Sequence, residues 1–316
     1  MSAFIRLQQT ASLTKRYFVM TLFPTKTSLN LLGLAAALPL AYAQPMDIRS
    51  VEPDLTIPKL ETGQPDIGKR VKQTIPDYEQ TDVYHVTYLP TDWVKGKRYP
   101  VLIEYAGNKY RGAYGDISTG RPEGSNMGYG ISGGRGFIWV CLPYLNATGD
   151  NIALTWWGDS KNRTAQPTLD YCNKAVPWIC EKYGGDTNRV ILCGFSRGAI
   201  ACNYLGLHDD ETAKLWRAFI PYSHYDGIAT WPYLASDRDS ALTRLKRLAK
   251  RPQFICHENT NSKLNLAATK QWIESTGMKA NLTFAETGFR NHNDAWLLRD
   301  SPIRVQLRAW LDRSLK

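Results

Sequence analysis

Short, wholly apolar runs alternate along the chain with longer stretches in which apolar residues recur at helical spacing. From Thr81 onward, the runs predict strands at Val83–Leu89, Val101–Tyr105, Phe137–Leu142, Val190–Cys193, Ala218–Tyr222, Phe254–Cys256 and Leu282–Phe284. The longer stretches predict helices at Thr168–Tyr183, Arg197–Leu207, Ser240–Ala249, Leu266–Ser275 and Pro302–Leu311. This alternation is typical of an α/β fold in which helices cover both faces of a mostly parallel central sheet. The functional site of such a fold lies at the carboxyl ends of the strands.

Residues 44–80 lack this alternation and contain five prolines with little periodic apolar pattern. Clusters of proline and polar residues interrupt helices and strands. We therefore expect an extended N-terminal arm over residues 44–80, packed on the surface of one domain that occupies residues 81–316.

The first 43 residues have the pattern of a signal peptide. They carry arginine and lysine but no acidic residue, and the apolar run Leu31–Leu40 leads into Ala41-Tyr42-Ala43. This order of basic, apolar and small residues predicts cleavage after Ala43 and a secreted or periplasmic protein. The alternative is an uncleaved membrane anchor, but the run is too short for a helical span, so no stable span is expected after cleavage. The true start is either Met1 or Met20.

Composition narrows the classes of partner. The 316 residues carry 39 Lys and Arg against 29 Asp and Glu, which gives a formal net charge of +10. The basic residues are spread out in short clusters typical of solvated turns and helix faces, so no nucleic-acid partner is expected. The six cysteines lie mostly in apolar runs, which favours buried thiols and at most one disulfide. No spacing of Cys and His indicates a metal site, and no other cofactor is expected.

The pattern G-x-S-x-G occurs twice, around Ser196 and around Ser132. A nucleophile elbow needs a strand before the serine and a helix after it, with glycines that permit close backbone contact. Ser196 has both, since the predicted strand Val190–Cys193 precedes it and a predicted helix begins at Arg197. Ser132 follows a glycine-rich segment and precedes a strand, so we expect it in a loop, as a chance match. Ser196 is therefore the predicted nucleophile.

His292 is the predicted general base. It lies in the loop Gly288–Asp294, after the last predicted strand and before the last predicted helix, where a base can reach the nucleophile. The other four histidines lie in strands, at a helix end or in a loop where this role is not expected: His85, His257, His208 and His224.

The acid that would orient this base has two candidates in the sequence. Glu258 directly follows the predicted strand Phe254–Cys256 and His257, and it ranks first. Asp226 follows the preceding strand and is the alternative. Asp294 is only two residues from His292, so we expect it to shape the loop instead.

An oxyanion hole requires two backbone N–H donors directed at the developing negative charge. One is expected from Arg197, the residue after the nucleophile. The other is expected from the segment that follows Val101–Tyr105, where Gly107 and Asn108 are the candidates. Gly107 suits a close backbone approach, although an ordinary turn glycine fits the same pattern.

Over about residues 80–316, these motifs resemble the α/β-hydrolase superfamily. Within it, the chain looks like secreted esterases of the feruloyl esterase, acetyl xylan esterase and polyhydroxybutyrate depolymerase type. The resemblance is carried by Leu89-Pro90, Gly185–Val190, Gly194–Ala199 and His292. It implies an α/β-hydrolase domain over residues 81–316, with Ser196 as nucleophile, His292 as base and the Arg197 amide in the oxyanion hole.

The chain departs from that family pattern in two places. Such enzymes often carry H-G-x-x-D with the Asp as the acid, whereas this chain has His257-Glu258-Asn259-Thr260-Asn261. Asn261 stands at the position of the Asp, so Glu258 and Asp226 both stay open as the acid. The segment Tyr105–Asn108 likewise lacks the H-G-G-G form.

These features favour a secreted serine hydrolase that cleaves carboxylic esters through an acyl-enzyme. Trp156-Trp157 and the ten tryptophans of the chain suit an acylated polysaccharide or a similar small-molecule ester, although core packing is the commoner use of such rings. The alternatives are a serine peptidase of the same fold and a catalytically weak secreted binding protein.

Overall fold

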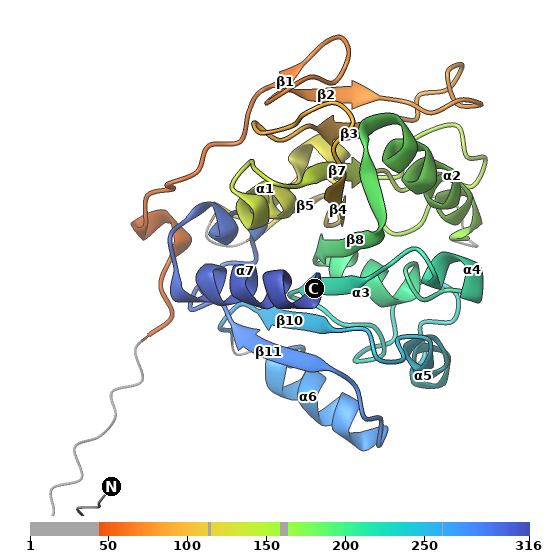
Figure 1. Ribbon diagram of the computed structural model, residues 1–316. Coiled ribbons are helices and arrows are strands. Elements are labelled where there is room, and N and C mark those ends of the chain that lie inside the picture. The colour runs from red at the N-terminus through yellow and green to blue at the C-terminus, as the bar shows by residue number, and fades with distance from the viewer. Residues whose placement is uncertain (1–43, 113–114, 159–163, 261) are drawn as a thin grey trace, which may run out of the picture. The chain divides into compact units, whose positions relative to one another are not determined.

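Nine strands form one sheet in the order β1-β2-β3-β7-β4-β8-β9-β10-β11 in the computed structural model, which describes residues 44–112, 115–158, 164–260 and 262–316 (Figure 1). The bounds of these strands are β1 Leu60–Glu61, β2 Arg70–Gln73, β3 His85–Tyr88, β4 Tyr99–Tyr105, β7 Ile138–Leu142, β8 Gly185–Phe195, β9 Ala218–Tyr222, β10 Gln253–His257 and β11 Leu282–Glu286. The strand β3 runs antiparallel to β2 and β7, whereas β7, β4 and β8 to β11 are mutually parallel. This topology confirms the predicted α/β class. The predicted signal peptide, residues 1–43, lies outside the described residues.

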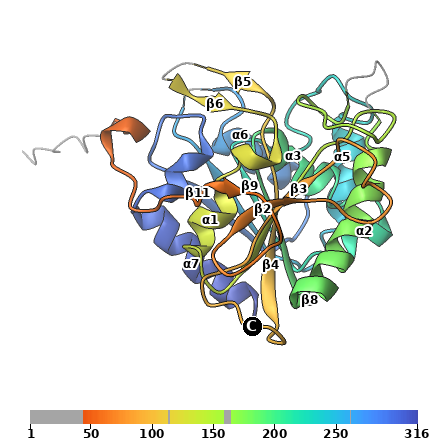
Figure 2. The same cartoon turned by 90° about the horizontal axis from the view of Figure 1, so that it is seen from above.

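Helices lie on both faces of the sheet. Their bounds are α1 Met127–Ser132, α2 Gln166–Tyr183, α3 Arg197–Tyr204, α4 Asp210–Ala213, α5 Arg238–Lys246, α6 Leu266–Ser275 and α7 Pro302–Ser314. Successive residues of a strand point to opposite faces. Accordingly, Val101 and Ile103 of β4 pack in one apolar cluster with α2, α3, α5 and α6, whereas Leu102 packs in a second cluster with α1 and α7. Figure 2 shows α1 and α7 on one side of the sheet and α2 on the other.

Each of the predicted strands and helices has a counterpart in the structure, and α6 has the predicted bounds. The N-terminal arm differs, because the sequence pattern predicts no strand in residues 44–80 and the structure places β1 and β2 there. These strands form the edge of the sheet, where β2 pairs antiparallel with β3. The sequence shows no apolar run here, because β1 has only two residues and the four residues of β2 include one arginine and one lysine.

The expectation of a loop at Ser132 is also wrong, since Ser132 is the last residue of the short helix α1. Glycines disfavour helices, which is why the segment does not read as one. They are needed here because a Cβ at Gly128 would lie 2.0 Å from the Trp139 ring. Buried Glu104 of β4 accepts the N–H groups of Met127 and Gly128 at 3.0 and 2.8 Å, which stabilises the first turn of α1.

Two further features of the described residues concern membrane-spanning helices and disulfide bonds. No helix in the described ranges combines the length and the apolar character needed to cross a membrane. The six cysteines all lie in the described part of the chain, and each is buried with a free thiol.

Candidate active site

Ser196 occupies a tight turn between β8 and α3. Its backbone angles, φ 56° and ψ −113°, are sterically disfavoured for a residue with a side chain. The Ser196 N–H donates to the Tyr222 carbonyl of β9 at 3.0 Å, and the Ser196 carbonyl accepts from the Ala199 N–H at 3.0 Å. Backbone strain of this kind costs about 1–3 kcal/mol and persists where the surrounding structure fixes it, as at many functional sites.

The two glycines of the pentapeptide allow this turn because backbone crosses backbone at both positions. A Cβ at Gly194 would lie 2.4 Å from the Gly198 carbonyl, and a Cβ at Gly198 would lie 1.9 Å from the carbonyl oxygen of Tyr105. Neither neighbour is a flexible side chain that could move aside. The local sequence therefore raises Ser196 on a sharp bend directly beside the end of β4.

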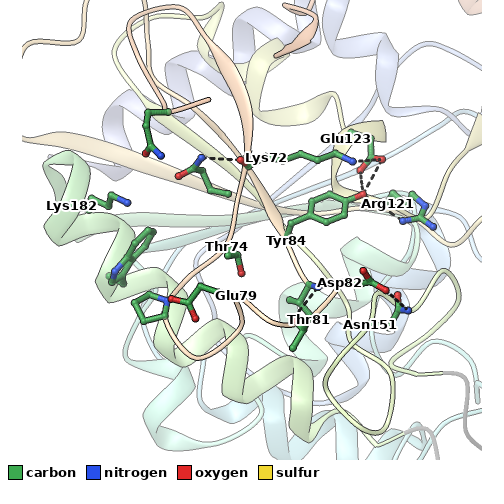
Figure 3. Close-up of a pocket in the computed structure, with 15 residues that line it drawn as sticks. Lys72, Thr74, Glu79, Thr81, Asp82, Tyr84, Arg121, Glu123, Asn151 and Lys182 are labelled. Atoms are coloured by element: carbon green, nitrogen blue, oxygen red, sulfur yellow. Dashed lines mark hydrogen bonds and ion pairs between the residues drawn. The ribbon is translucent and has the colours of Figure 1, made fainter. Parts of the chain in front are cut away.

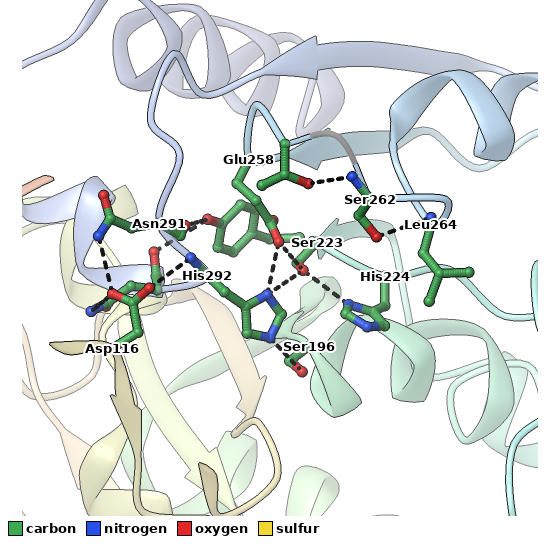
Figure 4. Close-up of polar contacts among 12 residues, drawn as sticks. Asp116, Ser196, Ser223, His224, Glu258, Ser262, Leu264, Asn291 and His292 are labelled. Atoms are coloured by element: carbon green, nitrogen blue, oxygen red, sulfur yellow. Dashed lines mark hydrogen bonds and ion pairs between the residues drawn. The ribbon is translucent and has the colours of Figure 1, made fainter. Parts of the chain in front are cut away.

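The structure brings Ser196, His292 and Glu258 together from three separate segments (Figure 4). The Ser196 Oγ lies 3.0 Å from the Nε2 of His292, and the Nδ1 of His292 lies 2.8 Å from the Oε1 of Glu258. His292 lies between β11 and the short helix η4 (Asp294–Leu298), and Glu258 directly follows β10. A serine, an imidazole and a carboxylate in this linear order can activate the serine hydroxyl.

Glu258 has the charge state that this arrangement needs. Burial acts to raise its pKa, but the hydrogen bond and charge interaction with His292 outweigh burial and lower the pKa to about 2. The carboxylate is therefore ionised at neutral pH. An ionised partner at Nδ1 holds the proton on that nitrogen and leaves Nε2 as the acceptor that faces Ser196.

Asp226, the alternative acid, is engaged elsewhere. Its carboxylate oxygens accept from the Nε and Nη2 of Arg244 of α5 at 2.8 and 3.1 Å, and both side chains are buried. This is the geometry of a structural ion pair that ties the loop after β9 to α5. Between the two candidates, the structure thus places Glu258 against His292.

The loop that carries His292 is held by groups that the sequence analysis did not single out. Buried Asp116 accepts the backbone N–H of His292 at 3.0 Å and the side-chain amide of Asn291 at 3.2 Å (Figure 4). From the N-terminal arm, the Ile48 N–H donates to the Oδ1 of Asn291 at 2.7 Å, and the Arg290 N–H donates to the Met46 carbonyl at 3.0 Å. These contacts hold the two residues that directly precede His292, while Asp116 holds the N–H of His292 itself.

The predicted oxyanion segment lies beside the elbow. Gly107 packs so closely on Phe195 that a Cβ there would lie 3.1 Å from the ring. The Asn108 Oδ1 accepts the Trp156 N–H at 2.8 Å. Arg197, whose N–H begins α3, also reaches back with a buried guanidinium that donates to the Gly107 carbonyl at 3.0 Å. The structure thus places Gly107 against Phe195 and the side chain of Arg197, the two residues that flank Ser196 in the chain.

The guanidinium of Arg197 joins three loops behind the site. Besides Gly107, it donates to the carbonyls of Gly120 at 3.2 Å and Trp156 at 2.6 Å, and it lies 3.6 Å from the centre of the Tyr144 ring. A planar fork with several N–H donors is suited to collecting carbonyl oxygens in this way. The sequence indicated only the amide of this residue, because G-x-S-x-G leaves the identity of the second x unconstrained.

Aromatic rings surround His292. The rings of Phe195, Tyr110 and His224 have their centres 4.6, 5.6 and 5.3 Å from its own. His224 leads on to Trp231 at 5.4 Å and then to Trp156 at 5.3 Å. A partly exposed row of rings beside His292 can pack against a flat group of a bound molecule.

A polar groove of about 1040 Å³ lies elsewhere, between the β2–β3 edge and α2 (Figure 3). Its wall is paired internally, since the Lys72 Nζ lies 3.7 Å from Glu123 and the Tyr84 hydroxyl donates to the same carboxylate at 2.8 Å. None of Ser196, Glu258 and His292 lines it. Among the described residues, no group of three or more His, Cys, Asp or Glu side chains could hold a metal ion.

Comparison with known proteins identifies the fold. No protein-family model and no curated protein sequence matches the chain. Solved structures do match, and an S-formylglutathione hydrolase from Agrobacterium tumefaciens aligns over 78% of this chain and 93% of its own, with a TM-score of 0.51 and 14% identity.

Two larger proteins align over the same 78% of this chain. The acylaminoacyl peptidase of Pyrococcus horikoshii gives a TM-score of 0.50 at 17% identity, and a candidate dipeptidyl aminopeptidase IV from Bacteroides ovatus gives 0.54 at 14%. The chain spans only 40% and 35% of their respective lengths. At such identities the likeness concerns architecture. Together with the sheet order, it shows that this chain has the α/β-hydrolase fold.

Proposed function

We propose that this protein is a serine hydrolase that cleaves carboxylic esters through an acyl-enzyme. The observation that carries the proposal is the continuous contact from Ser196 Oγ to His292 Nε2 at 3.0 Å and from His292 Nδ1 to Glu258 at 2.8 Å. The α/β-hydrolase fold supports it, because the three groups lie at the carboxyl ends of the parallel strands, where this fold positions its chemistry.

In the proposed acylation step, the Ser196 oxygen attacks the ester carbonyl while His292 Nε2 accepts the hydroxyl proton. The imidazolium that forms is stabilised by the anionic Glu258 at Nδ1 and then donates its proton to the departing alkoxide, which leaves as the alcohol. The negative charge on the former carbonyl oxygen is held by backbone N–H groups of Arg197 and of the Gly107–Asn108 segment.

Deacylation repeats the same steps with water in place of the alcohol. His292 accepts a proton from water, the hydroxide attacks the acyl carbonyl, and the proton returns to the Ser196 oxygen as the carboxylic acid departs. Every proton transfer in this cycle uses His292 Nε2, so one imidazole serves as base and acid in turn.

For the substrate, we propose an ester whose acyl or alcohol part carries a ring that can stack on aromatic side chains, such as an acylated polysaccharide or a similar small molecule. The row of rings formed by Tyr110, His224, Trp231 and Trp156 supports this choice. The basic and apolar pattern of residues 1–43 supports a secreted or periplasmic location.

The test compares the purified wild-type protein with Ser196→Ala and with Ser132→Ala, the serine of the second G-x-S-x-G. Hydrolysis of nitrophenyl acetate and butyrate and covalent labelling by a fluorophosphonate are measured in parallel. We expect the wild type and Ser132→Ala to turn over and to label. Ser196→Ala is expected to fail at both, with a loss of about a millionfold in kcat.

Three other outcomes would contradict the proposal. Labelling together with cleavage of peptide substrates and no ester turnover would identify a peptidase of this fold. A folded wild type that neither labels nor hydrolyses would identify a binding protein. Equal labelling of Ser196→Ala and wild type would show that the reactive group is another residue.

A further inference from the structure

Ser223, the residue after β9, lies at the centre of the polar contacts around Glu258 (Figure 4). Its Oγ is 3.1 Å from the Oε1 of Glu258, 2.9 Å from the Nδ1 of His292 and 2.9 Å from the Nδ1 of His224. Ser223 as a whole is 1% exposed, and its backbone N–H donates to the Cys256 carbonyl of β10 at 2.8 Å. A second serine is thus built into the same network as the nucleophile.

The backbone of Ser223 is strained to reach this place. Its φ is 88°, in the left-handed region that favours glycine. A serine that adopts such a conformation in the interior indicates that its side chain is required there, because a glycine would fit the backbone at a lower cost. The strained residue lies between the strand that anchors Ser196 and the strand that precedes Glu258.

The protons of the network can be assigned from its geometry. For Ser196 to donate to Nε2 of His292, the His292 ring must carry its proton on Nδ1. That nitrogen then cannot accept from Ser223, so the one hydroxyl proton of Ser223 goes either to Glu258 or to His224. The ionised carboxylate is the stronger acceptor. The remaining contact, between Ser223 Oγ and His224 Nδ1, is then a bond that His224 donates.

His224 suits this role because it is held neutral. Burial lowers its pKa to about 3, and the nearby His292 acts in the same direction. A neutral ring can donate from Nδ1 without presenting a positive charge that would compete with His292 for Glu258. It also leaves His292, whose ring centre is 5.3 Å away, as the imidazole that becomes charged in the reaction.

We propose that Ser223 and His224 are positioning residues of this site: His224 Nδ1–H donates to Ser223 Oγ, and the Ser223 hydroxyl donates to Glu258 Oε1, which holds the carboxylate against His292. The inference rests on the proposed hydrolase function. Among the described residues, the other carboxylate oxygen, Oε2, is buried and has no hydrogen-bond partner. The two bonds to Oε1 therefore fix the rotation of the carboxylate, and loss of one leaves His292 alone to do so.

The first test does not depend on activity. In protein labelled with ¹⁵N-histidine, the nitrogen shifts of a ring report its tautomer and charge. His224 is assigned by its loss from the spectrum of His224→Asn. We expect a neutral ring protonated on Nδ1 that does not titrate between about pH 5 and about pH 8. A ring protonated on Nε2, or one that titrates in this range, would overturn the proposal.

The second test separates the hydroxyl of Ser223 from its strained backbone. Ser223→Ala removes the hydroxyl and keeps the strain, whereas Ser223→Gly removes both and therefore remains foldable. We expect both variants to lower kcat about tenfold to a hundredfold, as for loss of a hydrogen bond to a charged group, with little change in KM. Wild-type kcat in Ser223→Gly would contradict a role for the hydroxyl.

The matched pair at position 224 tests the donor. His224→Asn keeps an N–H at about the reach of Nδ1, whereas His224→Leu does not, and both lose the ring contact with Trp231. We expect Asn to retain most of kcat and Leu to lose about tenfold or more. Equal activity of the two variants would overturn the proposal. If the wild type has neither ester turnover nor probe labelling, the proposed function fails, and the nitrogen shifts still decide whether His224 donates.

Discussion

Arg197 Nη2 donates to the carbonyl oxygen of Gly107 at 3.0 Å, so the residue after Ser196 also orients the segment after β4. In a planar trans peptide, the C=O of one residue and the N–H of the next point in opposite directions. With the Gly107 carbonyl fixed on the buried guanidinium, the Asn108 N–H points away from it. One arginine thus supplies one predicted oxyanion donor through its backbone and orients the other through its side chain.

Replacement of Arg197 by lysine should therefore impair turnover while the Arg197 amide position stays unchanged. A lysine keeps the positive charge but cannot donate to the carbonyls of Ala153, Trp156, Gly107 and Gly120 together. We expect kcat for nitrophenyl butyrate to fall about tenfold to a hundredfold, as for loss of part of an oxyanion hole, with KM changed much less.

Arg308→Lys is the matched control, because Arg308 donates to the carbonyls of Ile131 and Gly130, which belong to α1. It should keep kcat even if the melting temperature falls. A comparable loss of kcat in both variants would show that Arg197 acts only through general stability.

Glu258→Gln should lower kcat and keep stability, whereas Asp226→Asn should lower stability and keep kcat. Glutamine cannot stabilise the charged His292 ring, so we expect kcat to fall by about 10⁴ while folding is retained. Removal of the charge of Asp226 leaves buried Arg244 unpaired, which should cost about 3–5 kcal/mol of stability, with kcat per folded molecule nearly unchanged. Steady-state kinetics and urea unfolding of both variants check this, and the reverse pattern would restore Asp226 as the acid.

Gly198→Ala should prevent or severely weaken folding. The new methyl group would lie 1.9 Å from the Tyr105 carbonyl oxygen, which belongs to the central strand β4 and cannot move aside. We expect a loss of at least about 3 kcal/mol, seen as a fall of several degrees or more in Tm by differential scanning calorimetry. A Tm equal to that of the wild type would mean that the backbones at Gly198 and Tyr105 can separate enough to admit a methyl group.

Acid should destabilise the protein through its buried neutral histidines. Burial lowers the pKa of His85 to about 3, from 6.5 in an unfolded chain. Below about pH 6.5 the unfolded state therefore binds a proton at His85 that the native state does not. The stability that the neutral His85 contributes is therefore fully present above this pH. It is lost as the pH falls towards the native value, by about 1.4 kcal/mol per pH unit.

His85→Gln removes this proton while keeping a polar group beside the Tyr171 hydroxyl, which lies 2.7 Å from the His85 Nδ1. Urea unfolding at pH 7, 6 and 5 gives the free energy of unfolding as a function of pH. Below about pH 6.5, this free energy should fall less steeply with falling pH in the variant than in the wild type, by about 1.4 kcal/mol per pH unit. Equal slopes in the two proteins would show that His85 is protonated in the native state.

The sequence was sufficient to predict strands with long apolar runs and site residues whose roles follow from the neighbouring elements in the chain. Val190–Cys193 before Ser196 and a helix from Arg197 made the elbow recognisable. The place of His292 after the last strand identified the candidate base. The strand β2, with the polar sequence Arg70-Val71-Lys72-Gln73, has no such run, and its pairing with β3 provides the order that its own pattern lacks.

The supporting residues were not predictable, because their roles depend on contacts between distant segments. Asp116 accepts the backbone N–H of His292, which is 176 positions away in the chain. The Ser223 hydroxyl contacts Glu258, and the two residues follow two different strands, β9 and β10. Neither Asp116 nor Ser223 lies in a motif. A φ of 88° at Ser223 is a property of the folded backbone, and the choice between Glu258 and Asp226 required knowing that Arg244 occupies the latter.

The hydrogen bond from the Ile48 N–H to the Asn291 side chain joins positions that are 243 residues apart in the chain. Asn291 directly precedes His292. Contacts of such long sequence separation are slow to form, because the intervening chain must first be brought together. The site is therefore assembled from both extremes of the folded chain. During synthesis, the elbow can exist long before the imidazole has a fixed place. A partly made chain would hold Ser196 without His292 beside it, and the contact between the two would form only when the segment around His292 joins the N-terminal arm.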